Sequence, residues 1–98
     1  MEQKRVPHSR LHAVIHGRVQ GVNFRYYTLR TAERLGLVGW VANRWDGTVE
    51  TVAEGEQEAL ESFVAFLNRG SPSALVTRVD ESWQTPTGDF GRFRVRGS

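Results

Sequence analysis

The sequence has no cysteine among its 98 residues. A disulfide framework, a thiolate nucleophile and a cysteine-based zinc or iron–sulfur site are therefore excluded. Long hydrophobic runs are also missing, because the longest apolar stretches, such as residues 35–42, fall far short of the ~20 residues that a membrane-spanning helix needs. Residues 1–10 are polar and lack the apolar core of a signal peptide. We expect a cytoplasmic protein that does not associate with membranes.

Lysine is almost absent, since Lys4 is the only lysine among 13 basic residues. The planar guanidinium of arginine suits phosphate and carboxylate groups. A preference for arginine throughout the source proteome would give the same composition, however, and the net charge is only +2. The arginine content alone therefore predicts no particular ligand.

The length allows one domain and excludes a two-domain enzyme. With 39% hydrophobic and 24% charged residues, the composition is that of an ordinary globular protein with a modest core. We expect residues 1–9 to form a flexible tail and residues 10–98 to form a single domain. No repeat, linker or low-complexity tract divides it.

Hydrophobic periodicity predicts two helices and five strands. Helical spacing covers residues 24–35 and 56–68, and each segment is followed closely by a glycine that can end a helix. Alternating patterns predict the strands, with an Asp46-Gly47 hairpin turn between the second and the third: 11–17, 37–43, 48–54, 75–83 and 92–96. The order predicts an α+β fold, a split β-α-β sandwich with one antiparallel sheet and two helices on one face.

The turn between the first strand and the first helix has the features of an anion site. Gly17 and Gly21 bracket it, and it ends at a helix N-terminus, where free N–H groups and the helix dipole attract anions. Arg25 stands in the first helical turn, where a cation is unfavourable unless an anion binds there. We interpret the segment as a phosphate cradle formed by these residues: Val19, Gln20, Gly21, Val22, Asn23, Phe24 and Arg25.

Other phosphate-binding motifs do not fit this spacing. Gly17 and Gly21 are four residues apart and no Lys-Ser or Lys-Thr follows, so the segment is neither a Walker loop nor a G-x-G-x-x-G motif. Phosphatases with a catalytic cysteine also close a loop with arginine, but Val19 occupies the nucleophile's position here. Water must therefore be the nucleophile of any hydrolysis at this loop.

Asn43 ends the second predicted strand on the same face as Gly39 and Val41. If that face lies under the helices, Asn43 can approach the start of the first helix. Its amide can hold a water by hydrogen bonds but is too weak a base to deprotonate it. We expect Asn43 to position water, and the sequence shows no general base.

At these two segments the chain resembles the acylphosphatase family. The family patterns G-x-V-Q-G-V-x-F-R and G-W-V-x-N-x-x-x-G-x-V-x-x-x-x-x-G match Gly17 to Arg25 and Gly39 to Gly55, and the resemblance extends over roughly Arg10 to Val95. It departs at Asn23, where an aromatic or small residue is common, and at Arg44, where a small hydroxyl residue often follows the asparagine.

The resemblance implies a ferredoxin-like sandwich that hydrolyses the carboxyl–phosphate bond of acyl phosphates to carboxylate and inorganic phosphate, without a metal or other cofactor. By analogy, Arg25 and the amides of residues 19–24 bind the phosphoryl group, and Asn43 orients the attacking water. Inorganic phosphate is then both product and competitive inhibitor. We expect a monomer.

Two other functions remain open. A non-catalytic nucleic-acid or protein-binding module can use the same sandwich, although the aromatic motif of RNA-recognition domains is absent and residues 91–96 hold one aromatic. A maturation-type domain acting on carbamoyl phosphate is the third possibility, but such domains normally sit in long chains. His12 and His16 lie ~13 Å apart along one strand and are not expected to share a metal.

Overall fold

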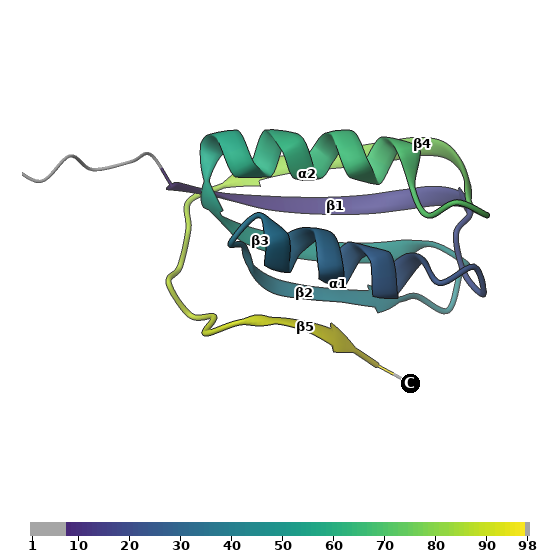
Figure 1. Cartoon of the computed structure of the whole chain (residues 1–98), viewed down its shortest axis with the longest axis horizontal. Helices are drawn as coiled ribbons and strands as arrows, with labels where there is room; N and C mark the ends of the chain where they lie inside the picture. The colour runs from purple at the N-terminus through teal and green to yellow at the C-terminus, as the bar shows by residue number, and fades with distance from the viewer. Residues whose placement is uncertain (1–7, 98) are drawn as a thin grey trace, which may run out of the picture.

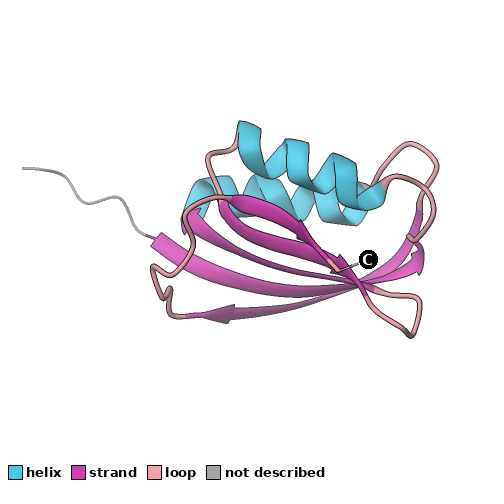
Figure 2. Cartoon of the chain, turned by 90° about the horizontal axis from the view of Figure 1, so that it is seen from below, coloured by secondary structure: helices cyan, strands magenta, loops and turns pink. Residues whose placement is uncertain are grey.

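Seven elements follow one another in the predicted order. The computed structural model describes residues 8–97, and its elements are β1 (His8–Arg18), α1 (Phe24–Arg34), β2 (Val38–Asn43), β3 (Val49–Glu56), α2 (Gln57–Arg69), β4 (Leu75–Gln84) and β5 (Phe93–Arg96) (Figure 1). The strands form one sheet, and Figure 2 shows both helices on the same face of it. The α+β prediction is therefore confirmed.

The sheet is antiparallel, as predicted, except at one edge. The strand order is β4-β1-β3-β2-β5, and β5 runs parallel to β2 while all other neighbours are antiparallel. The cause is the connection between β4 and β5. Strand β4 ends at Gln84, beside Arg10, and Val38 begins β2 at the same end of the sheet. Residues 85–92 cross this end, so β5 starts next to the beginning of β2 and follows its direction (Figure 1).

Glu54 holds the crossing segment in place. Its buried carboxylate accepts hydrogen bonds from the backbone N–H groups of Thr87 and Gly88 and pairs with Arg10 at 2.7 Å. Burial on its own raises the pKa of Glu54, but these hydrogen bonds outweigh burial and lower the pKa to about 2. The carboxylate is therefore a stabilising anchor at this end of the sheet.

The core lies between the sheet and the two helices. Leu11, Ala13 and Ile15 of β1 are fully buried, which confirms that the odd positions of this strand face inward. The helices contribute Phe24 and Phe63 to the same cluster. Because β1 pairs with a strand on each side and packs under α2, the end of β1 and the loop that follows it have a fixed position.

The first strand begins earlier than expected. His8 pairs with Glu56, and the Ser9 hydroxyl donates to Gln57 Oε1 at 2.6 Å. Residues 8 and 9, which were predicted to belong to the tail of residues 1–9, therefore belong to the sheet, because strand pairing and this hydrogen bond hold them there. Residues 1–7 of that prediction lie outside the described residues. No helix described in residues 8–97 is long and apolar enough to cross a membrane.

Two of the three histidines of β1 pair with carboxylates on the face of the sheet opposite the helices. His12 Nε2 lies 2.7 Å from Glu50, and His16 Nε2 lies 2.9 Å from Asp80. A hydrogen bond from His16 and the nearby Arg78 lower the pKa of Asp80. Within residues 8–97, no three His, Cys, Asp or Glu side chains gather closely enough to hold a metal ion.

Candidate active site

The loop of residues 19–23 joins β1 to α1, and glycines determine how it leaves the sheet. Gly17 follows a break in the β1–β4 register and has φ of 125°, and a Cβ atom there would overlap the carbonyl oxygen of Leu75. Gly21 has φ of 73° and open space around it, so it is needed for its conformation rather than for room. Glycine is therefore required at position 17 because there is no room for a Cβ atom, and at position 21 because of the backbone conformation.

The N-terminus of α1 has free donors and no acid. Asn23 adopts the left-handed conformation, with φ of 63°, and its side chain forms no cap hydrogen bond. Asparagine tolerates this conformation better than most residues, which accounts for its presence here. Within residues 8–97, the backbone N–H groups of residues 19–23 have no hydrogen-bond acceptor, and the helical ladder starts with Tyr27 N–H to Asn23 O. These groups are available to an anion.

Arg25 lies in the first turn of α1, which holds no acidic residue. Its guanidinium takes part in none of the ion pairs found among residues 8–97. The residue lines a pocket of about 380 Å³ together with Val19, Gly21, Asn23, Phe24, Tyr26, Leu29, Asn43 and Val95. The structure thus brings five of the seven predicted cradle residues and Asn43 to one pocket.

Asn43 reaches this pocket from the end of β2. It shares a face with Val41, which is completely buried under the helices. Its Oδ1 atom is buried and has no hydrogen-bond partner among the described residues. Because a buried acceptor without a partner costs free energy, such an atom indicates a ligand or water that pairs with it in the functional state.

Gln20 and Val22 do not line the pocket. The Gln20 side chain donates to the carbonyl oxygens of Arg44, at 2.7 Å, and Thr48, at 2.9 Å. The Val22 carbonyl accepts from the Ser71 hydroxyl at 2.8 Å. These contacts hold the loop to the β2–β3 hairpin and to the segment after α2, so the Gln20 side chain and the Val22 carbonyl position the loop, while the backbone N–H groups of both residues have no backbone acceptor among the described residues. The sequence pattern did not distinguish side chains that hold the loop in place from residues that bind a ligand, because both occur in the same motif.

The β2–β3 hairpin is closed by Asp46. Its carboxylate accepts hydrogen bonds from the Thr48 hydroxyl and backbone N–H, and these bonds lower the pKa of Asp46. The Arg44 side chain approaches Asp46 at 3.9 Å rather than the pocket. The turn is therefore rigid on its own, and Asn43 begins it in a defined place.

Three pocket residues were not predicted as site residues. Tyr26 and Leu29 come from α1 and Val95 comes from β5, and they form a partly apolar wall beside Arg25. No local motif could have found Val95, because its position depends on β5 lying beside β2. Trp45, in the turn between β2 and β3, is 96% exposed and does not line this pocket.

Comparisons with known proteins agree with this geometry. The family model described as acylphosphatase matches residues 11–95. An acylphosphatase of Thermococcus kodakarensis is 49% identical over 88 residues, covering 90% of this chain and 96% of the relative. One from Pelotomaculum thermopropionicum is 46% identical and covers 89% and 95%.

A solved structure gives the same result for the fold. The crystal structure of acylphosphatase from Bacillus subtilis superposes with a TM-score of 0.88 at 39% identity, and the match covers 91% of this chain and 99% of that one. Fold, motifs and relatives agree over nearly the whole described chain. The chain therefore belongs to the acylphosphatase family of hydrolases.

Proposed function

We propose that this pocket hydrolyses the carboxyl–phosphate bond of acyl phosphates by direct attack of water on phosphorus. One observation above all supports this: Asn43 lines the same pocket as Arg25 and the N-terminus of α1, and its buried Oδ1 atom has no hydrogen-bond partner among the described residues. An acceptor for water and donors for an anion are thus combined at one place.

Phosphoryl binding is assigned to Arg25 and to the backbone N–H groups of residues 19–24. Free amides at a helix N-terminus carry partial positive charge, and the guanidinium adds a full charge that can bind two oxygens. Val19 and Phe24 have buried side chains, so packing in the core holds their backbone groups in place. Donors fixed before the substrate binds stabilise developing charge without reorganisation.

Water positioning is assigned to Asn43. Its Oδ1 accepts a hydrogen bond from the water, which leaves a lone pair of the water oxygen free to attack phosphorus. The new P–O bond forms as the bond between phosphorus and the acyl oxygen breaks, and the electron pair of that bond leaves with the carboxylate. A phosphoryl oxygen accepts the proton of the water.

This reaction needs no strong base. A carboxylate is a good leaving group, and phosphoryl transfer passes through a loose transition state with little demand on the nucleophile. Charge stabilisation and alignment then supply most of the rate. Inorganic phosphate, bound by the same donors, is expected to compete with substrate, and one chain holds all the proposed residues, so a monomer suffices.

The test is to compare a simple acyl phosphate with a phosphate monoester, with and without EDTA. We expect hydrolysis of the acyl phosphate that EDTA does not reduce, and little turnover of the monoester, whose alkoxide leaves poorly without a metal or a general acid. Equal turnover of both substrates, or loss of activity with EDTA, would contradict the proposal. Competitive inhibition by inorganic phosphate is the accompanying measurement.

A further inference from the structure

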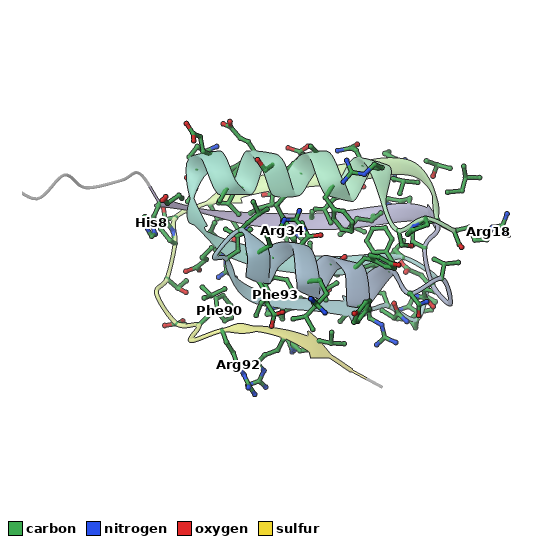
Figure 3. All side chains as sticks on the ribbon, in the orientation of Figure 1. His8, Arg18, Arg34, Phe90, Arg92 and Phe93 are labelled. Carbon is green, nitrogen blue, oxygen red and sulfur yellow. The ribbon has the colours of Figure 1, made fainter. Side chains whose placement is uncertain are left out.

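Three arginines form a row on the face of the sheet opposite the helices. Phe93 is buried in the core, so the alternation of β5 places Arg92, Arg94 and Arg96 on the outer face. Arg92 continues this strand geometry, since its carbonyl oxygen accepts from the Gly39 N–H at 3.1 Å. Figure 3 shows the Arg92 side chain extending outward beyond β5. We call these three residues the β5 arginine row.

The charges of this row are not neutralised within the described chain. None of the ion pairs found among residues 8–97 involves its members. Elsewhere on the same face the basic groups are paired, for example Arg10 with Glu54 and His12 with Glu50. A strip of positive charge therefore runs along one edge of the sheet, with no ion-pair partner in the described part of the chain.

Aromatic rings lie beside the row. Trp40 of β2 is directly opposite Arg94 in the register, and the guanidinium carbon of Arg96 lies 4.3 Å from the centroid of its ring. Together with Phe90, these residues line a depression of about 710 Å³, whose one acidic member is Asp89. It is larger than the pocket at Arg25 and shares no residue with it.

We propose that the β5 arginine row binds single-stranded nucleic acid. Arginine side chains along the row contact successive phosphates, and a base stacks on the guanidinium of Arg96, which itself lies on Trp40. Sheet surfaces with aromatic and arginine planes recognise unpaired bases in this way, whereas a duplex hides its base faces. This site is independent of the proposed hydrolysis.

The length of the row favours a strand over a single nucleotide. Side chains two residues apart on one face of a strand are ~6.8 Å apart, so the row spans roughly 13 Å. A free nucleotide would leave part of that row unpaired. An acidic peptide would satisfy the charges but would not use the stacked Arg96 and Trp40 planes, which suit flat rings.

Binding is tested with a fluorescently labelled oligothymidylate at low and moderate salt. The Arg92→Gln/Arg96→Gln variant is compared with Arg34→Gln/Arg69→Gln, which removes two charges from the helices instead. We expect the first variant to bind at least tenfold more weakly and to lower the slope of log affinity against log salt by about 1.4, and the second to bind nearly as the parent does. Acyl phosphate hydrolysis serves as the folding control for both.

A second readout is the fluorescence of Trp40 in a Trp45→Phe/Trp83→Phe background. Quenching by the oligonucleotide, and its loss in the Arg92→Gln/Arg96→Gln variant, would support stacking at this site. Equal weakening in both charge variants would overturn the proposal, as would equally tight binding of free thymidine monophosphate. Tighter binding of polyglutamate would assign the row to an acidic protein instead, and loss of binding in Arg25→Gln would assign the oligonucleotide to the other pocket.

Discussion

At the end of the sheet where β1 leads into α1, Arg25 lies at a helix N-terminus and forms no ion pair with the described residues, whereas at the opposite end Glu54 is surrounded by donors from Arg10, Thr87 and Gly88. Both groups are charged, and Arg25 lies in the first turn of α1 whereas Glu54 lies near the end of β3. Of the two, only Glu54 has its charge compensated by other residues in the described range 8–97.

The difference separates a residue kept for stability from one available to a ligand. A buried carboxylate with several donors stabilises the folded state. A cation in the first turn of a helix opposes the helix dipole and is retained for another reason. The second helix follows the usual rule, since its first turn holds Glu58. A local violation of this kind is consistent with the proposed site at this end of the molecule.

The largest effect is expected from Arg25→Gln. Removing the guanidinium from the phosphoryl site should lower kcat/KM by roughly 30- to 1000-fold, or about 2 to 4 kcal/mol, and should weaken inhibition by phosphate as well. Initial rates and the phosphate Ki measure both. The matched control is Arg34→Gln at the other end of α1, for which we expect near-parental kinetics. Unchanged phosphate affinity in Arg25→Gln would place the anion elsewhere.

Asn43→Ala should separate catalysis from binding. If the amide holds the water, kcat falls by roughly 100-fold while the phosphate Ki hardly changes, because the interaction acts mainly in the transition state. Urea unfolding of the same preparation shows whether the hairpin is intact. Asn68→Ala, on the exposed face of α2, is the control. A folded Asn43→Ala protein with parental kcat would remove Asn43 from the mechanism.

Acid should weaken the other end of the sheet. The folded-state pKa of Glu54 is about 2, below its ordinary value of 4.5, so the unfolded state binds more protons between these values. The stabilisation by Glu54 is complete well above pH 4.5 and is lost as the pH falls toward 2. By pH 3 the loss in the free energy of unfolding, relative to neutral pH, is about 2 kcal/mol. Urea midpoints against pH measure the loss. The Glu54→Gln variant should be less stable at neutral pH, and its urea midpoint should fall less steeply with acid. An unchanged dependence of the midpoint on pH would contradict the assignment of this loss to Glu54.

The smallest effect concerns the two ends of α1. Without an anion, Arg25→Gln should leave stability unchanged or raise it, whereas Arg34→Gln should lower it by about 0.3 to 1 kcal/mol, because Arg34 complements the dipole at the C-terminus. Adding phosphate should stabilise the parent and Arg34→Gln but not Arg25→Gln. Thermal unfolding at low salt tests this, and a phosphate effect equal in all three proteins would argue against a site at Arg25.

Periodicity was sufficient to predict every helix and strand, because each directs apolar side chains toward a common core, although those of β4 are only partly buried. It did not predict the direction of β5, which depends on how residues 85–92 cross the sheet. Arg25 and Asn43 could be proposed from their places in the first turn of the first predicted helix and at the end of the second predicted strand, and both line one pocket. The roles of Gln20 and Val95 required tertiary contacts: one bridges to a hairpin, and the other reaches the pocket from the last strand.

The placement of β1 also bears on how the chain folds. As an inner strand of the sheet it pairs with β3 and with β4, so Arg10 lies beside Gln84, a residue far away in the sequence. Long loops must close before such contacts form, and domains rich in distant pairings fold more slowly than helical ones of equal size, in milliseconds to seconds. During synthesis, the first strand remains without its β4 neighbour until the segment around Gln84 has left the ribosome.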